Sequence, residues 1–154
     1  MRLITVMCFT ETPTLDNLPT YTKTEVAAHQ LERALHLFLD ENDYVCAITL
    51  AGACEEILGK LLEKSGKEPS LRSLVKLCVA IEKKDLGEEC SPKEFVTMAN
   101  AFRDGLKHYT DGQPITVPRD AAVEIIDRAI ENYWQLTAQE TSLMCRFRKE
   151  AHGY

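Results

Sequence analysis

Apolar residues recur at a spacing of about 3.6 along most of the chain, and this spacing predicts amphipathic helices. Thr22 and Glu25 have the spacing of a capping box, and Ser91 precedes Pro92 and Glu94 in the same arrangement. Both motifs mark helix starts. Five helices are predicted, over residues 22–39, 44–64, 70–81, 91–109 and 118–148.

The second predicted helix has the widest apolar sector, which is typical of a helix buried against several others. Its segment Ala51-Gly52-Ala53 would let a neighbouring backbone come close. No strand is needed after residue 21, so the sequence predicts an all-α, five-helix up-and-down bundle over residues 22–154. Residues 1–21 form a separate N-terminal extension, either a short strand (3–9) or a disordered segment.

The chain has 154 residues, a hydrophobic content of 45% and a formal net charge of -6. These values describe a globular domain and argue against broad, nonspecific binding to nucleic acid. No apolar stretch is long enough to span a membrane. Its six cysteines form no CxxC pair, which favours free thiols in a reducing cytosol. We therefore expect a cytoplasmic protein.

The segment from Arg103 to His108 carries the main candidate chemistry. A guanidinium holds phosphate oxygens bidentately, and an imidazole moves protons near neutral pH. Together they are a minimal set for cutting a phosphodiester without a metal. Five residues advance about 140° around a helix, so the two side chains converge only if the helix loosens at Gly105 or if two subunits share a groove.

The chain resembles the HEPN superfamily of small, often dimeric α-helical bundles. The resemblance rests on an arginine, four intervening residues and a histidine on the penultimate of five helices. Catalytic members often carry a polar residue directly after the arginine, where this chain has Asp104. The resemblance implies a homodimer that acts as a metal-independent endoribonuclease of a toxin–antitoxin or other defence system. An antitoxin would be a further partner. Some members have a tyrosine two residues after the histidine, whereas here Thr110 holds that position and Tyr109 precedes it.

In such an enzyme His108 would act as general base or general acid, and Arg103 would stabilise charge on the phosphoryl group. Asp104, Lys107 and Tyr109 are the candidate substrate-binding residues for an RNA. Glu55 and Glu56, on the second helix, are candidate supports, because an acid within an apolar run can orient His108 or pair with Arg103.

Other hypotheses for the function stay open. Catalytic members have relatives that serve as non-enzymatic dimerisation modules, in which Arg103 would form a salt bridge and His108 would point away. A small-ligand pocket inside the bundle has no specific residue behind it. A second match, Arg146 and His152, falls in a tail expected to fray. His29 and His36 are too far apart for one metal ion, and no motif indicates a cofactor.

Overall fold

The computed structural model describes residues 18–85, 91–108 and 112–153, and every regular element within them is helical. The helices are α1 (Lys23–His36), α2 (Tyr44–Lys64), α3 (Ser70–Asp85), α4 (Pro92–Lys107), α5 (Arg119–Thr137) and α6 (Ser142–His152), and a π-helical segment, Leu37–Glu41, follows α1. The all-α prediction is confirmed. The strand predicted at residues 3–9 lies outside the described residues.

The two predicted capping boxes are present. The Glu25 amide donates to Thr22 Oγ1 at 3.2 Å, and the Thr22 amide donates to the Glu25 carboxylate at 2.7 Å. Ser91 and Glu94 cap α4 in the same reciprocal way, with Pro92 in the first turn. These caps satisfy amides that have no partner within the helix. Both predicted helix starts are therefore confirmed.

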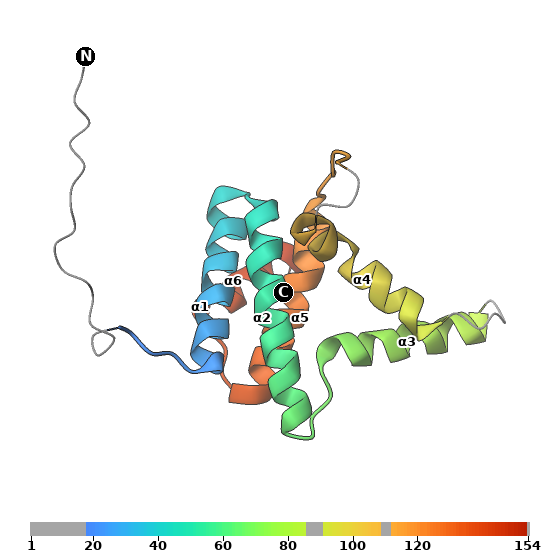
Figure 1. The fold of residues 1–154 in the computed structure, drawn as a ribbon, viewed down its shortest axis with the longest axis horizontal. Helices are drawn as coiled ribbons and strands as arrows, with labels where there is room; N and C mark the ends of the chain where they lie inside the picture. The colour runs from blue at the N-terminus through green and yellow to red at the C-terminus, as the bar shows by residue number, and fades with distance from the viewer. Residues whose placement is uncertain (1–17, 86–90, 109–111, 154) are drawn as a thin grey trace, which may run out of the picture.

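Four helices, α1, α2, α5 and α6, pack around the main core, as Figure 1 shows. In this core Phe147 of α6 lies edge-on to Phe38, with ring centroids 5.2 Å apart. The largest side chains of the core that are fully buried are Leu31, Leu35, Ile48, Leu58, Ile126, Ile130 and Phe147. Burial of these apolar side chains is the main force that holds the four helices together.

Helices α2 and α5 run parallel, which contradicts the predicted up-and-down order. A Cβ on Gly52 would approach Ile125, and one on Gly59 would approach Asn132. Residue numbers therefore rise together along both helices. The parallel pairing is possible because α3 and α4 intervene in the chain and return it to the end at which α2 begins.

The described residues contain six α-helices, so the predicted count of five is wrong. Ala138 takes a left-handed conformation with φ of 54° and ends α5 well before the predicted residue 148. Thr141 then caps α6 by accepting a hydrogen bond from the Met144 amide at 3.3 Å. Arg146 and His152 lie in this helix, and not in a frayed tail. They contact different acids: Arg146 Nη1 lies 2.7 Å from Asp40, and His152 Nε2 lies 2.8 Å from Asp127.

Helices α3 and α4 form a two-helix arm that extends away from the other four helices (Figure 1). Its root is fixed by buried polar contacts: the Ser70 amide donates to Asn132 Oδ1 at 2.8 Å, and Ser70 Oγ donates to the Arg128 carbonyl at 3.0 Å. Further out, the arm exposes several large apolar side chains.

Four cysteines lie among the described residues, and all four are free thiols. Cys54 is buried, and burial raises the pKa of its thiol to about 12. Cys46 of α2 is exposed. Within the described ranges, no helix combines the length and the apolar character that crossing a membrane requires. The cytoplasmic location stays a prediction.

The break at Ala138 can be tested by glycine substitution. Because a left-handed conformation costs alanine more than glycine, Ala138→Gly should raise the free energy of unfolding by roughly 0.5 kcal/mol. The matched control is Ala80→Gly, at an exposed position inside α3, which should lower it by about 1 kcal/mol. Urea denaturation measures both. A loss of stability in Ala138→Gly equal to that of the control would indicate one continuous helix.

Candidate functional site

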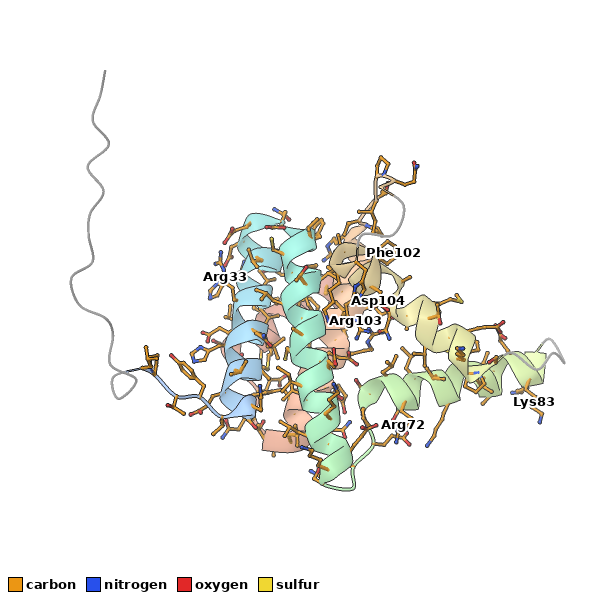
Figure 2. The ribbon with its side chains drawn as sticks, in the orientation of Figure 1. Arg33, Arg72, Lys83, Phe102, Arg103 and Asp104 are labelled. Atoms are coloured by element: carbon orange, nitrogen blue, oxygen red, sulfur yellow. The ribbon has the colours of Figure 1, made fainter. Side chains whose placement is uncertain are left out.

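Arg103 lies on the side of α4 that faces α2, where the arm meets the bundle (Figure 2). A Cβ on Gly52 would lie 2.7 Å from Arg103 Cδ, closer than real side chains approach. Gly52 is therefore the position in α2 that makes room for the stem of Arg103. The small residues predicted to admit a neighbouring backbone admit a long side chain instead.

The guanidinium of Arg103 is held by two acids. Its Nε donates to Asp104 Oδ1 at 3.0 Å, and its Nη1 lies 3.5 Å from Glu55 Oε2. The Arg103 side chain is 17% exposed and that of Glu55 only 5%. The predicted pairing of Glu55 with Arg103 is present, and it places a carboxylate in the interior of the molecule.

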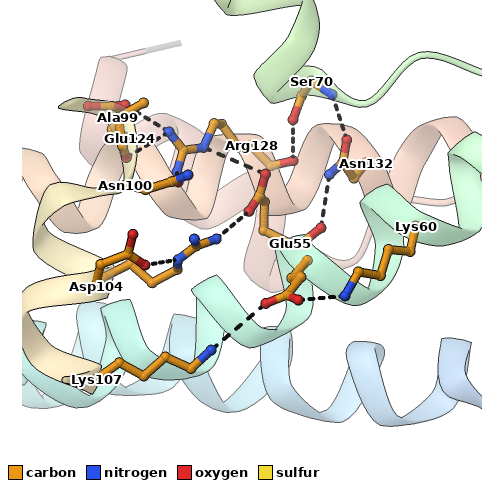
Figure 3. Close-up of polar contacts among 12 residues, drawn as sticks. Glu55, Lys60, Ser70, Ala99, Asn100, Asp104, Lys107, Glu124, Arg128 and Asn132 are labelled. Atoms are coloured by element: carbon orange, nitrogen blue, oxygen red, sulfur yellow. Dashed lines mark hydrogen bonds and ion pairs between the residues drawn. The ribbon is translucent and has the colours of Figure 1, made fainter. Parts of the chain in front are cut away.

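A second guanidinium, that of Arg128 on α5, lies near the other carboxylate oxygen of Glu55, with Nε 4.0 Å from Oε1 (Figure 3). Arg128 also donates to the Ala99 carbonyl at 3.0 Å, to Glu124 at 3.0 Å and to Asn100 Oδ1 at 3.3 Å. Its Nε is buried and makes no hydrogen bond with any described residue. The three charges join α2, α4 and α5.

Burial shifts the pKa values of Glu55 and Arg128. Burial raises the pKa of Glu55, and the nearby guanidinium groups of Arg128 and Arg103 only partly offset this effect. Neither pair is within hydrogen-bonding distance, so the carboxylate loses water without a close replacement. Burial also lowers the pKa of Arg128, while Glu55 and Glu124 act in the opposite direction.

Glu56 lies one residue further along α2 and faces solvent. Lys60 Nζ donates to its carboxylate at 2.6 Å, and Lys107 Nζ lies 3.8 Å away. The hydrogen bond from Lys60 is the largest cause that lowers the pKa of Glu56. The two predicted support residues therefore have opposite environments, and Lys107 is bound to the exposed one.

His108 ends α4 in an extended conformation, and its backbone amide donates to the Asp104 carbonyl at 3.0 Å. The side chain is exposed, and no hydrogen bond or ion pair joins it to another described residue. Tyr109 lies outside the described residues. The structure thus brings Arg103 together with Asp104 and Glu55, but gives no contact between Arg103 and His108.

A cavity of about 380 Å³ opens beside Arg103, between α2 and the root of the arm. It holds both charged and apolar side chains, and His108 is not among them. The lining residues are Glu55, Glu56, Gly59, Lys60, Glu63, Pro69, Leu71, Arg72, Val75, Pro92, Val96 and Arg103. This cavity provides specific residues for a small-ligand pocket, for which the sequence had indicated none.

Sequence reasoning missed Arg128 and Asn132. A signal was available: both lie on the same face of α5 as the buried residues Ile125 and Ala129, so they interrupt an apolar stripe. Asn132 Nδ2 donates to the Glu55 carbonyl at 3.3 Å, which connects the stripe to the buried acid. Polar residues in such positions are expected to be paired.

Comparisons with protein-family models, with curated proteins and with solved structures found no match. Membership of the HEPN superfamily therefore stays a prediction. Among the described residues, no three His, Cys, Asp or Glu side chains are placed to hold a metal ion.

The opposite environments of Glu55 and Glu56 predict opposite effects of pH. Because the folded-state pKa of Glu55 is raised, its contribution to stability is largest below its ordinary value of 4.5 and is lost as the pH rises through the folded pKa. The stability of the native protein relative to Glu55→Gln should therefore fall between pH 4 and pH 7.

Glu56→Gln is the matched control. The folded-state pKa of Glu56 is lowered, so its contribution is present above 4.5 and is lost as the pH falls through the folded value. Relative to Glu56→Gln, the native protein should gain stability as the pH rises. Urea denaturation at a series of pH values measures both differences. Two slopes of the same sign would contradict the buried position of Glu55.

Proposed function

We propose that this chain is a non-catalytic helical interaction module that binds a basic amphipathic helix of a partner protein. The observation that carries the proposal is a groove between the arm and α5, apolar at one end and acidic at the other. Apolar grooves of this kind receive helices through side chains spaced one turn apart.

The apolar end of the groove lies on the arm. Met98 is 70% exposed and Leu77 is 58% exposed, and Ile81 also faces solvent. A hollow of about 370 Å³ is lined by Leu74, Val75, Cys78, Phe95, Met98, Ala99 and Glu124. Large exposed apolar patches with a polar border typically mark protein interaction sites.

The acidic end lies on α5. A second hollow of about 300 Å³ shares Leu74 and Glu124 with the first, so the two form one groove. It also contains Asp127 and Glu131, whereas its cation, Arg128, is bound by Glu124 and lies beside Glu55. A partner with lysine or arginine beside its apolar face complements this charge. A second copy of this chain, with a net charge of -6, complements it less well.

The contacts of Arg103 also support a non-catalytic function. Its Nε is engaged by Asp104, and its side chain packs on Gly52 in the interior. A guanidinium that pairs with a buried acid contributes to the structure without a substrate.

A labelled helical peptide of about 18 residues, with leucine on one face and lysine on the other, is the probe for the groove. Fluorescence anisotropy should show binding that weakens with salt, and Met98→Glu should weaken it at least tenfold. Val45→Glu, at an exposed apolar position outside the groove, is the matched control and should bind normally.

Two results would contradict this proposal. The first is equal binding by the native protein and Met98→Glu. The second is a stable dimer in light scattering that Met98→Glu dissociates, because this result would assign the groove to a second copy of the chain. A matching peptide with glutamate in place of lysine should not bind.

The second candidate is the metal-independent endoribonuclease, and one observation favours it. Arg103 and Lys107 are one turn apart on α4, next to the exposed His108. In a homodimer, two copies of this turn could face one RNA strand. His108 would then take the proton of the ribose 2′-hydroxyl or protonate the leaving oxygen, Arg103 would stabilise the phosphoryl charge, and a cyclic phosphate would result. An antitoxin would cover the same turn.

The nuclease is tested with structured RNA in the presence of EDTA. If His108 is the proton-transfer group, His108→Ala should reduce cleavage at least a hundredfold, whereas His29→Ala on α1 should not. His29 is exposed and contacts Tyr21, so its loss should leave the fold intact. Equal cleavage by all three proteins, or none by the native one, would remove this candidate.

A further inference from the structure

We infer that the cavity beside Arg103 binds a zwitterionic α-amino acid with a branched aliphatic side chain. This site is lined by a different set of residues from the proposed peptide groove and does not depend on that proposal. The two hollows share only Val75. At about 380 Å³, the cavity is within the size range of small-molecule sites.

Arg103 provides donors for a carboxylate. Its Nε is engaged by Asp104, but its Nη atoms make no hydrogen bond with any described residue and have only the longer contact of 3.5 Å to Glu55. A guanidinium with unused donors at the wall of a cavity recognises a carboxylate in a bidentate manner. Gly52 makes room for this side chain, because a Cβ at that position would lie 2.7 Å from Arg103 Cδ.

The other charged residues of the cavity favour a ligand that carries both a positive and a negative group. Lys60 is paired with Glu56 and Arg72 with Glu63, so these four rim charges cancel. Glu55 balances Arg103 in the same way. A doubly charged phosphate would face these carboxylates without a cation of its own, which is unfavourable. An ammonium group beside the carboxylate of the ligand can contact Glu56 Oε2, because Lys60 engages Oε1 and Lys107 lies as far as 3.8 Å from Oε2.

The apolar side chains in the wall select the ligand's side chain. The apolar lining residues are Leu71 and Val75 of α3, Val96 of α4, and the prolines Pro69 and Pro92. No aromatic side chain is among the lining residues, so the wall suits an aliphatic group better than a planar ring. Leucine combines such a group with the two opposite charges.

Isothermal titration calorimetry and thermal unfolding test the site with four probes: leucine, leucinamide, 4-methylpentanoate and inorganic phosphate. Leucine should bind, and at ten times its dissociation constant it should raise the midpoint of unfolding by about 4 °C. Leucinamide lacks the carboxylate and 4-methylpentanoate lacks the ammonium group, so each should bind at least tenfold more weakly.

Substitutions in and away from the cavity test whether leucine binds there. Val96→Trp fills the cavity and should abolish binding, whereas Val45→Trp, at an exposed position away from it, should not. Glu56→Gln changes a side chain that is 42% exposed and should weaken the binding of leucine at least fivefold, which keeps the test valid if Val96→Trp fails to fold.

The inference is overturned if no probe binds, if 4-methylpentanoate binds as well as leucine, or if phosphate is the preferred probe. Binding that is unchanged in Glu56→Gln would also overturn it. Met98 lines the peptide groove and does not line this cavity, so Met98→Glu should leave leucine binding unchanged. Failure of the peptide experiment can therefore be distinguished from failure of the leucine experiment.

Discussion

The carboxylate of Glu55 is the constraint on which the position of the arm depends. It lies in the interior between the guanidinium groups of Arg103 and Arg128, which belong to two other helices. Removing one partner from a buried ion pair leaves an uncompensated charge and typically costs about 3–5 kcal/mol. The arm adds few side chains to the main core, so this group of charges and the hydrogen bonds of Ser70 hold its root.

The same constraint separates the candidate functions. A catalytic arginine stabilises negative charge on the substrate, but the guanidinium of Arg103 already lies beside two acids, Asp104 and the buried Glu55. Acidic groups around Arg103 reduce its attraction for phosphate and leave it suited to a ligand that brings its own cation. The arm, by contrast, exposes large apolar side chains such as Leu77 and Met98 to solvent. These features together favour binding over catalysis.

Local signals made the helix starts predictable, because a cap involves residues only three positions apart. Thr22 and Ser91 are examples. The end of α5 was not predictable in this way: alanine is the strongest helix former, so nothing in the residue itself marks Ala138 as a break.

Part of the candidate site was predictable. The pairing of Glu55 with Arg103 was one of two contacts predicted for an acid within an apolar run, the other being with His108, since a buried acid needs a partner. The contribution of Arg128 did not follow, because it depends on α5 lying parallel to α2. That arrangement is set by the path of the arm between them, and the periodicity of either helix carries no information about it.

The parallel arrangement of α2 and α5 also aligns their dipoles. Both positive ends lie at one end of the bundle, and both negative ends lie at the other, which is unfavourable for neighbouring helices. The side chains compensate at each end. Asp43 caps α2 and Asp120 lies in the first turn of α5, whereas Lys67 donates to the Gln135 carbonyl at 2.5 Å near the end of α5. Asp43, Asp120 and Lys67 therefore each offset part of the unfavourable alignment of the two helix dipoles.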